Sequence, residues 1–168
     1  MDQKGVRETD ARKLMKGAVK WAGIGLAAGL VLIQFFQPEK NSSPVDPSED
    51  FLTLASPPGT VAELIKGSCY DCHSNQTVYP WYSKVAPVSW YLQKHIKEGK
   101  ADLNASEYGS LDKADKIEFL VDICEVVEAG KMPLPSFTLI HKEARLSEED
   151  KEAICLWSEE AALKVMRE

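Results

Sequence analysis

The sequence predicts an all-α protein with one N-terminal transmembrane helix, a linker rich in proline and serine, and a small helical domain. Three observations support this prediction. An apolar segment near the N-terminus is long enough to cross a bilayer, later segments carry apolar residues at helical spacing, and strand-like alternation is almost absent. A chain of 168 residues suffices for one compact domain plus an appended segment.

The predicted transmembrane helix covers residues 18–36, AVKWAGIGLAAGLVLIQFF. Its only charge is Lys20 near its start, where a long side chain can reach the interface. At about 1.5 Å per residue the segment spans roughly 28 Å, close to the ~30 Å of hydrocarbon in a bilayer. The alternatives are a cleaved signal peptide, for which residues 37–40 are a poor cleavage site, and a buried core helix.

Charge around this helix predicts its orientation. Six basic residues occur in positions 1–20, whereas only Lys40 follows the helix closely. The positive-inside rule therefore places a basic arm, residues 1–17, in the cytoplasm and the rest of the chain on the other side.

The next segment, residues 37–59, predicts a semi-extended linker because it contains five prolines and several serines. The whole chain has a formal charge of -6, but 14 basic and 23 acidic residues follow Lys20, so this part carries about -9. That excess argues against nucleic acid as a partner and favours a basic protein surface.

The folded domain is expected over residues 60–168, as four helices separated by turns. Thr60 and Glu63 form a capping-box pattern for the first helix. The second is predicted over 88–98 before a glycine, and the third over 112–129 before another. Ser147 is the expected N-cap of the fourth, with an acidic residue three positions later.

Cys69, Cys72 and His73 form a C-x-x-C-H motif, the pattern of c-type haem attachment. Thiols three positions apart lie on one helical turn and can reach the two vinyl groups along one haem edge. His73 then stands beside the iron as proximal ligand. A thioredoxin-like site would need a βαβ surround and a four-ligand zinc site a second close cysteine pair, so the motif predicts one covalently bound haem c.

Met132 is the expected distal iron ligand. It stands in the loop KMPLP, where proline holds the backbone extended. This loop has little of the apolar periodicity that would indicate a core role for the methionine. His141 is the rival donor, in a loop after two apolar residues. The choice matters because His/Met ligation raises the reduction potential relative to two imidazoles.

The remaining cysteines leave two alternatives. Cys124 and Cys155 are expected on the third and fourth helices, outside the reducing cytoplasm, so we expect a disulfide rather than two buried thiols.

Four aromatic residues after the motif either wall the haem or pack as ordinary core. They are Tyr79, Trp81, Tyr82 and Trp90.

Three segments, CYDCHSNQTVYPWYSKVAPVSW, GKMPLPSF and LSEEDKEAICLW, resemble the bacterial haem-binding domain family related to mono-haem c-type cytochromes. The resemblance covers roughly Thr60 to Trp157. It implies a small cytochrome c-like domain in the periplasm or extracytoplasmic space, here on a single-pass helix of the bacterial inner membrane. It also implies attachment through the two motif cysteines, with His73 as proximal and Met132 as distal ligand.

The expected function is single-electron transfer between extracytoplasmic redox proteins, with no substrate transformed. A haem-based redox or gas sensor, in which Met132 is displaced, is one alternative. Its difficulty is that the basic arm is too short for an output domain. A peroxidase-like haem enzyme is another, with His141 as the obvious candidate for an acid-base group.

Overall fold

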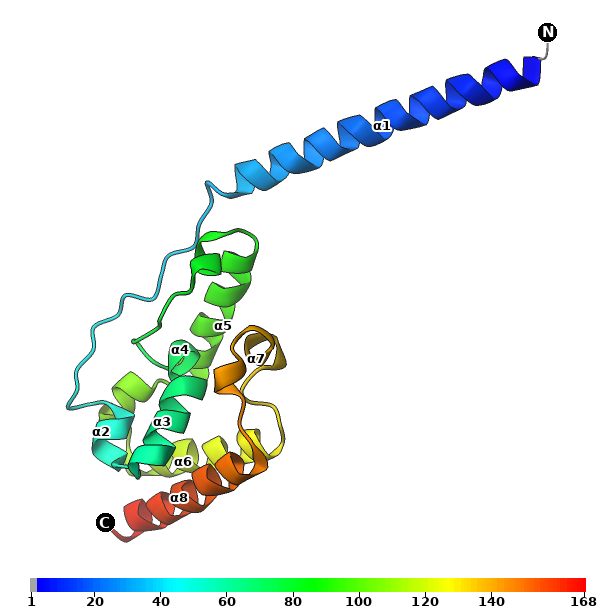
Figure 1. Ribbon diagram of the computed structural model, residues 1–168. Helices are drawn as coiled ribbons and strands as arrows, with labels where there is room; N and C mark the ends of the chain where they lie inside the picture. The colour runs from blue at the N-terminus through cyan, green and yellow to red at the C-terminus, as the bar shows by residue number, and fades with distance from the viewer. Residues whose placement is uncertain (1–2) are drawn as a thin grey trace. The chain divides into compact units, whose positions relative to one another are not determined.

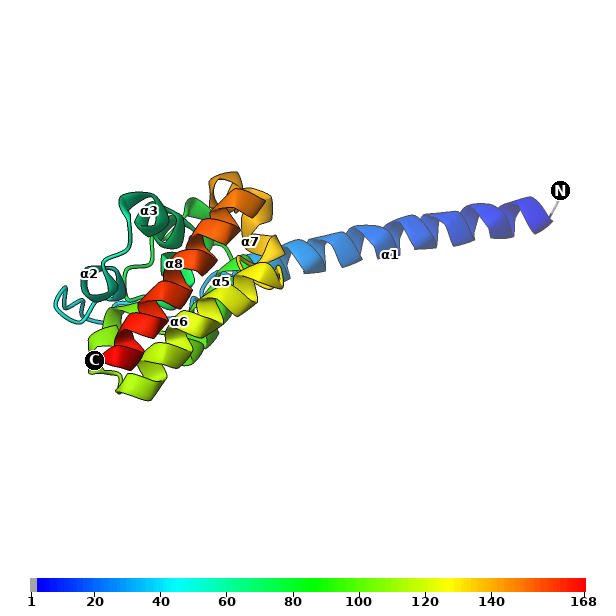
Figure 2. The same ribbon diagram turned by 90° about the horizontal axis from the view of Figure 1, so that it is seen from below.

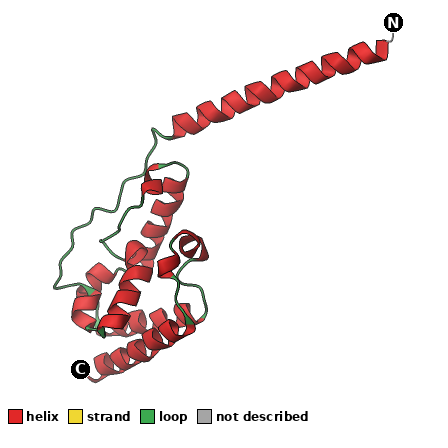
Figure 3. Cartoon of the chain, viewed as in Figure 1, coloured by secondary structure: helices red, strands yellow, loops and turns green. Residues whose placement is uncertain are grey.

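The computed structural model describes the backbone of residues 3–168 and the side chains of residues 12–168, and its regular elements there are all helical (Figure 3). The prediction of an all-α protein with an apolar N-terminal helix is confirmed. The chain divides into two compact units, residues up to 39 with 81–91, and residues 40–80 with 92–168, here called unit 1 and unit 2.

Unit 1 is dominated by α1 (Gln3–Ile33; Figure 1), which includes the described part of the basic arm. Its stretch Arg12–Ile33 has a mean hydropathy of 1.4, and none of that stretch is buried in the protein. By length and composition it is suited to cross a membrane. The helix ends at Ile33, whereas the predicted span ran to Phe36; Phe35 and Phe36 follow the helix and are exposed.

Unit 1 also holds the short helix η1 (Trp81–Lys84) and the first turn of α5 (Val88–Asp102). The second helix was expected to stop before Gly99, but α5 continues for a further turn. Gly99 is buried and packs closely against Cys72 and His73. This close packing explains why a glycine stands here although the helix does not end at it.

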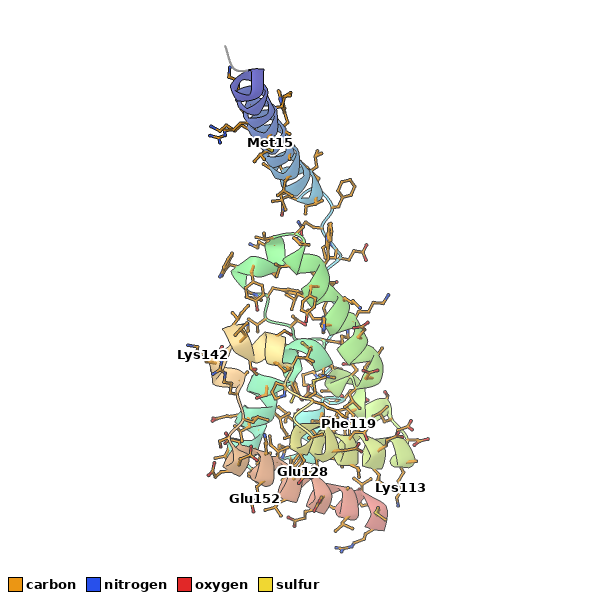
Figure 4. The ribbon with its side chains drawn as sticks, turned by 90° about the vertical axis from the view of Figure 1, so that its right-hand side faces the viewer. Met15, Lys113, Phe119, Glu128, Lys142 and Glu152 are labelled. Atoms are coloured by element: carbon orange, nitrogen blue, oxygen red, sulfur yellow. A yellow bond between two sulfur atoms is a disulfide. The ribbon has the colours of Figure 1, made fainter. Side chains whose placement is uncertain are left out.

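Unit 2 contains the remaining helices, which surround one apolar core. They are α2 (Phe51–Ala55), α3 (Gly59–Ser68), α4 (Tyr70–His73), η2 (Ala105–Ser110), α6 (Lys113–Glu128), α7 (Pro135–Ile140), η3 (Lys142–Ala144) and α8 (Glu148–Arg167). Helices α6 and α8 pack side by side along their length (Figures 1 and 2). Figure 4 shows Phe119 of α6 among the side chains of this unit.

The ends of α6 and α8 follow their sequence signals. Asp112 caps α6, accepting from the backbone N–H of Asp115, and Gly130 follows that helix with a φ of 63°. Ser147 and Asp150 form the expected capping box of α8. Both predicted helices are confirmed, with bounds within a residue or two.

The start of α3 differs from its prediction. The helix begins at Gly59, with Pro58 as its N-cap and no side-chain hydrogen bond at the cap. Thr60 therefore lies inside the first turn, and the Thr60–Glu63 pattern does not form a capping box. With Pro58 as the N-cap, the helix begins two residues too early for Thr60 to occupy that position.

The expected linker is shorter than residues 37–59. Helix α2 lies within that range, capped by Asp50, which accepts from the backbone N–H of Leu52. Phe51 is only 1% exposed, and its ring centroid lies 4.9 Å from that of Tyr108 and 4.7 Å from that of Phe119. The folded core of unit 2 thus begins before Thr60, with an aromatic side chain as its anchor.

Candidate haem site

Unit 2 contains a partly open cavity of about 430 Å³, a size within the usual range of cofactor pockets. Its wall is mainly apolar and aromatic, and it includes Phe51, Ile65, Tyr70, Phe119, Ile123 and Val127. Three potential haem-binding side chains line the same cavity: Cys69, His73 and Met132. Residues separated by some sixty positions in sequence therefore meet at one pocket.

The C-x-x-C-H motif forms one tight helical turn. Cys69 ends α3 and caps α4, and its carbonyl oxygen accepts from the backbone N–H groups of Cys72 at 3.2 Å and His73 at 2.9 Å. The two cysteines are not joined to each other. This local geometry is the one that attachment to two positions along one haem edge requires.

Both motif thiols are protonated at neutral pH in the folded chain. Burial, with a smaller contribution from Cys72, raises the pKa of Cys69 to about 12. Burial and the charge of Asp71 raise the pKa of Cys72 to about 11. Reactive disulfide-exchange cysteines have lowered pKa values, so these thiols do not resemble a thioredoxin-like site.

The imidazole of His73 is held in one orientation by the residue that directly follows α5. Its Nδ1 atom lies 3.2 Å from the carbonyl oxygen of Leu103. Because a carbonyl can only accept, Nδ1 carries the proton and the lone pair of Nε2 stays available to a metal. Burial lowers the pKa of His73 and so favours the neutral ring, although backbone hydrogen bonds to Leu103 and Gly99 oppose this effect.

Met132 reaches the cavity through the chain reversal that follows α6. Gly130 has a positive φ, and the backbone N–H groups of Lys131 and Met132 both donate to the carbonyl of Val126, at 2.9 and 3.1 Å. The side chain of Met132 is half-buried and lines the cavity. A thioether donor thus shares the pocket with the His73 imidazole.

His141, the rival donor, has other contacts. Its ring stacks on Phe137 with a centroid distance of 4.4 Å, and its Nδ1 atom lies 3.1 Å from a carboxylate oxygen of Glu143. Within the described part of the chain, the residues that line the cavity include Met132 but not His141. The geometry therefore favours Met132 over His141 as the second donor.

The segment after the motif is fixed by Asp71. Its carboxylate accepts from the backbone N–H of Val78 at 2.9 Å, and its carbonyl accepts from the Thr77 hydroxyl at 2.8 Å. Burial raises the pKa of Asp71, while the Val78 N–H opposes that change. These bonds hold the chain that leaves α4 against the motif turn.

The cysteines outside the motif form a disulfide. The sulfur atoms of Cys124 and Cys155 are 2.11 Å apart and their Cα atoms 4.6 Å apart, which joins α6 to α8. Among the described side chains, one group of three potential metal ligands lies close together: these two cysteines and Glu128. Since the two sulfurs are bonded to each other, that group is no metal site.

None of the four aromatic residues after the motif is among those that line the cavity, so the structure does not favour the haem-wall alternative for them. The Tyr79 hydroxyl accepts from the backbone N–H of Asn41 and contacts the side-chain oxygen of Gln93 at 3.0 Å, within unit 2. Trp81, Tyr82 and Trp90 belong to unit 1. The aromatic rings that do line the cavity are Phe51, Tyr70 and Phe119.

Several residues that shape the site carry no motif that sequence reasoning could use. Tyr70 is fixed by its hydroxyl, which donates to the Asp50 carboxylate at 3.1 Å and accepts from the backbone N–H of Leu52 at 3.2 Å. Leu103 contributes only its carbonyl. The single available signal was Gly99, a glycine that is buried within a helix and faces Cys72.

The residues present suit a haem. An apolar cavity accepts the macrocycle, and an imidazole and a thioether offer the two donors. Of the two motif cysteines, Cys69 lines the cavity, whereas Cys72 lies in the same tight turn beside His73 but is not among the lining residues. His73 and Met132 would hold the iron, and Cys69 and Cys72 would hold the porphyrin edge.

Comparison with known proteins agrees with this assignment. Searches of the curated proteins and of the solved structures gave no match. A family model described as "Haem-binding domain" matches residues 28–160, which include every residue of the site. Because the match extends over most of the chain, this protein belongs to the haem-binding domain family.

Proposed function

We propose that this protein is a membrane-anchored mono-haem c-type cytochrome that transfers single electrons between extracytoplasmic redox partners. The observation that carries the proposal is the convergence of Cys69, His73 and Met132 on one apolar cavity. Cys69 and Cys72 would form the two thioether bonds, and His73 and Met132 the two axial bonds.

Bound haem supplies an iron that alternates between the ferric and ferrous states. The chain sets the conditions for this exchange. Leu103 holds the His73 imidazole in its metal-binding tautomer, and Met132 as a ligand would raise the reduction potential relative to a second imidazole. The mainly apolar wall would limit contact between water and the cofactor. If His73 and Met132 both bound the iron, no position would remain for a substrate, which would favour electron transfer over catalysis.

The proposed location is the bacterial inner membrane, with α1 as a single-pass anchor. The excess of basic residues before the apolar stretch favours an N-terminus in the cytoplasm. The Cys124–Cys155 disulfide fits an oxidising space for the haem domain, such as the periplasm.

The redox partners are proposed to present a basic surface. The chain after Lys20 carries 14 basic and 23 acidic residues, so complementary charge would accelerate the encounter. The rate at which the protein associates with such a partner should then fall as ionic strength rises.

The decisive test is a pyridine haemochrome spectrum of the protein purified from cells competent for haem attachment. The expected spectrum is that of a haem with both vinyl groups converted to thioethers, and acid extraction should leave the haem on the chain. Cys69→Ser and Cys72→Ser should each lose a thioether, whereas the Cys124→Ala/Cys155→Ala variant should keep both. Haem that is extracted from the unaltered protein would refute covalent attachment.

The carrier role has a separate test. The iron should be six-coordinate and low-spin in both oxidation states, without rapid carbon monoxide binding. A high-spin iron that binds carbon monoxide readily would contradict an electron carrier and favour a sensor or an enzyme.

A further inference from the structure

The end of α1 is joined to residues 81–91 by a side-chain amide. Gln34, the first residue after α1, donates through Nε2 to the carbonyl oxygen of Ala86 at 2.9 Å. Its Oε1 accepts from the backbone N–H of Ala86 at 2.9 Å. Ala86 is only 3% exposed. Two hydrogen bonds thus fix the middle of the 81–91 segment at the end of the apolar helix.

Another hydrogen bond fixes the same segment four residues further on, at Trp90. The indole Nε1 of Trp90 donates to the carbonyl oxygen of Phe36 at 2.6 Å. Trp90 therefore satisfies a backbone carbonyl in the chain that leaves α1, where the helix can no longer do so.

The 81–91 segment exposes large apolar and aromatic side chains. Trp81 is 80% exposed and Tyr91 52% exposed, and Val85 and Val88 are each 42% exposed. Phe35 and Phe36, to which the segment is joined, are also exposed. Such a cluster at one place is unusual for a surface that faces water only.

The composition of this cluster matches one environment. Tryptophan and tyrosine concentrate where a bilayer meets water, because each has a large apolar ring and one polar group. Lys84 is exposed in the same segment and can contact anionic headgroups. Since the segment is bonded to the residues that end the apolar helix, it lies at the depth where that helix would leave the hydrocarbon.

We propose that the 81–91 segment is a membrane-contact element that lies in the phospholipid headgroup region beside the end of α1. This inference rests on the proposed function in one respect, that α1 is inserted in the membrane. It adds a second lipid contact from a region more than forty residues away in sequence. The segment would therefore be part of the anchor rather than of the haem wall.

Photocrosslinking in the full-length, haem-loaded protein tests the inference. The protein is placed in nanodiscs of phosphatidylethanolamine and phosphatidylglycerol, with p-benzoylphenylalanine at one position in each variant. The test position is Trp81. Leu26, which is 68% exposed within α1, reports whether the anchor is inserted. Leu156, an exposed apolar residue of α8, is the matched control outside the segment.

Mass spectrometry should find phospholipid adducts at positions 26 and 81 and little or no adduct at position 156. Adduct at 26 without adduct at 81 would overturn the inference and leave the anchor intact. No adduct at 26 or 81 would overturn both. Equal adduct at 81 and 156 would also overturn it, because lipid contact would not then be a property of the segment. Covalent haem, measured in each sample by pyridine haemochrome, reports separately on the cytochrome assignment.

Discussion

The Nδ1 atom of His73 lies 3.2 Å from the carbonyl oxygen of Leu103, the residue directly after α5. Gly99 lies one turn earlier, and its carbonyl accepts from the backbone N–H of Leu103 at 2.9 Å. A Cβ atom at Gly99 would stand 3.3 Å from Cε1 of His73 and 3.0 Å from the carbonyl oxygen of Cys72. Helix α5 therefore positions the imidazole by a hydrogen bond and by close backbone packing.

Gly99→Ala is expected to destabilise the protein and to disturb the iron ligand. The added methyl group must displace either the backbone of Cys72 or the ring of His73, at a cost of about 1–3 kcal/mol in the free energy of unfolding. The displacement should also change the reduction potential, because the imidazole loses its alignment with Leu103. Guanidinium denaturation and a potentiometric titration measure the two effects.

Gly67→Ala is the matched control for that variant. Gly67 also lies in a helix close to the motif, but a Cβ atom there would meet nothing within 4 Å. We expect equal or greater stability, since alanine is favoured over glycine inside helices by about 1 kcal/mol, and an unchanged potential. Equal effects of the two substitutions would refute the positioning role of Gly99.

Met132→Ala is expected to open the second axial position of the haem. The reduced protein should then bind carbon monoxide rapidly, and its reduction potential should fall, because the thioether that favours the ferrous state is lost. Optical spectroscopy with carbon monoxide and a potentiometric titration are the measurements.

Two further variants make this experiment specific. Met166 is 56% exposed near the C-terminus, so Met166→Ala should change neither property. His141→Ala should likewise keep a six-coordinate iron, because His141 stacks on Phe137. If His141→Ala opened the iron and Met132→Ala did not, His141 would be the distal ligand instead.

The sequence predicted those parts of the structure whose signals are local. The C-x-x-C-H turn, the capping box at Ser147 and the end of α6 at Gly130 each depend on residues within a few positions of one another. Met132 could be singled out because the proline and glycine around it indicate a loop, where a methionine that only fills the core is not expected.

The parts that sequence reasoning missed depend on distant contacts. Phe51 belongs to the core because Tyr108 and Phe119 surround it, and nothing in the proline-rich segment around it shows this. Leu103 acts through its carbonyl, which every residue possesses. For Trp81 and Trp90 the sequence leaves both a haem wall and ordinary core packing open, and their place in the same unit as the end of α1 comes from contacts distant in sequence.

Ser147→Ala and Thr60→Ala should separate a capping box that forms from one that does not. The Ser147 hydroxyl accepts from the backbone N–H of Asp150 at 3.2 Å, so its loss should cost about 1 kcal/mol in the free energy of unfolding. Thr60 lies after the Pro58 cap, and its substitution should change stability by less than about 0.5 kcal/mol. Equal losses in denaturation would contradict the observed start of α3.

Removal of the Cys124–Cys155 disulfide should lower the free energy of unfolding by about 3 to 4 kcal/mol, because the bridge closes a loop of 31 residues in the unfolded chain. The Cys124→Ala/Cys155→Ala variant is compared with the unaltered protein by guanidinium denaturation, with and without a thiol-free reductant. The reductant should destabilise only the unaltered protein. The haem spectrum should not change, since neither cysteine lines the cavity. Equal stability of the two oxidised proteins would show that the bridge contributes nothing.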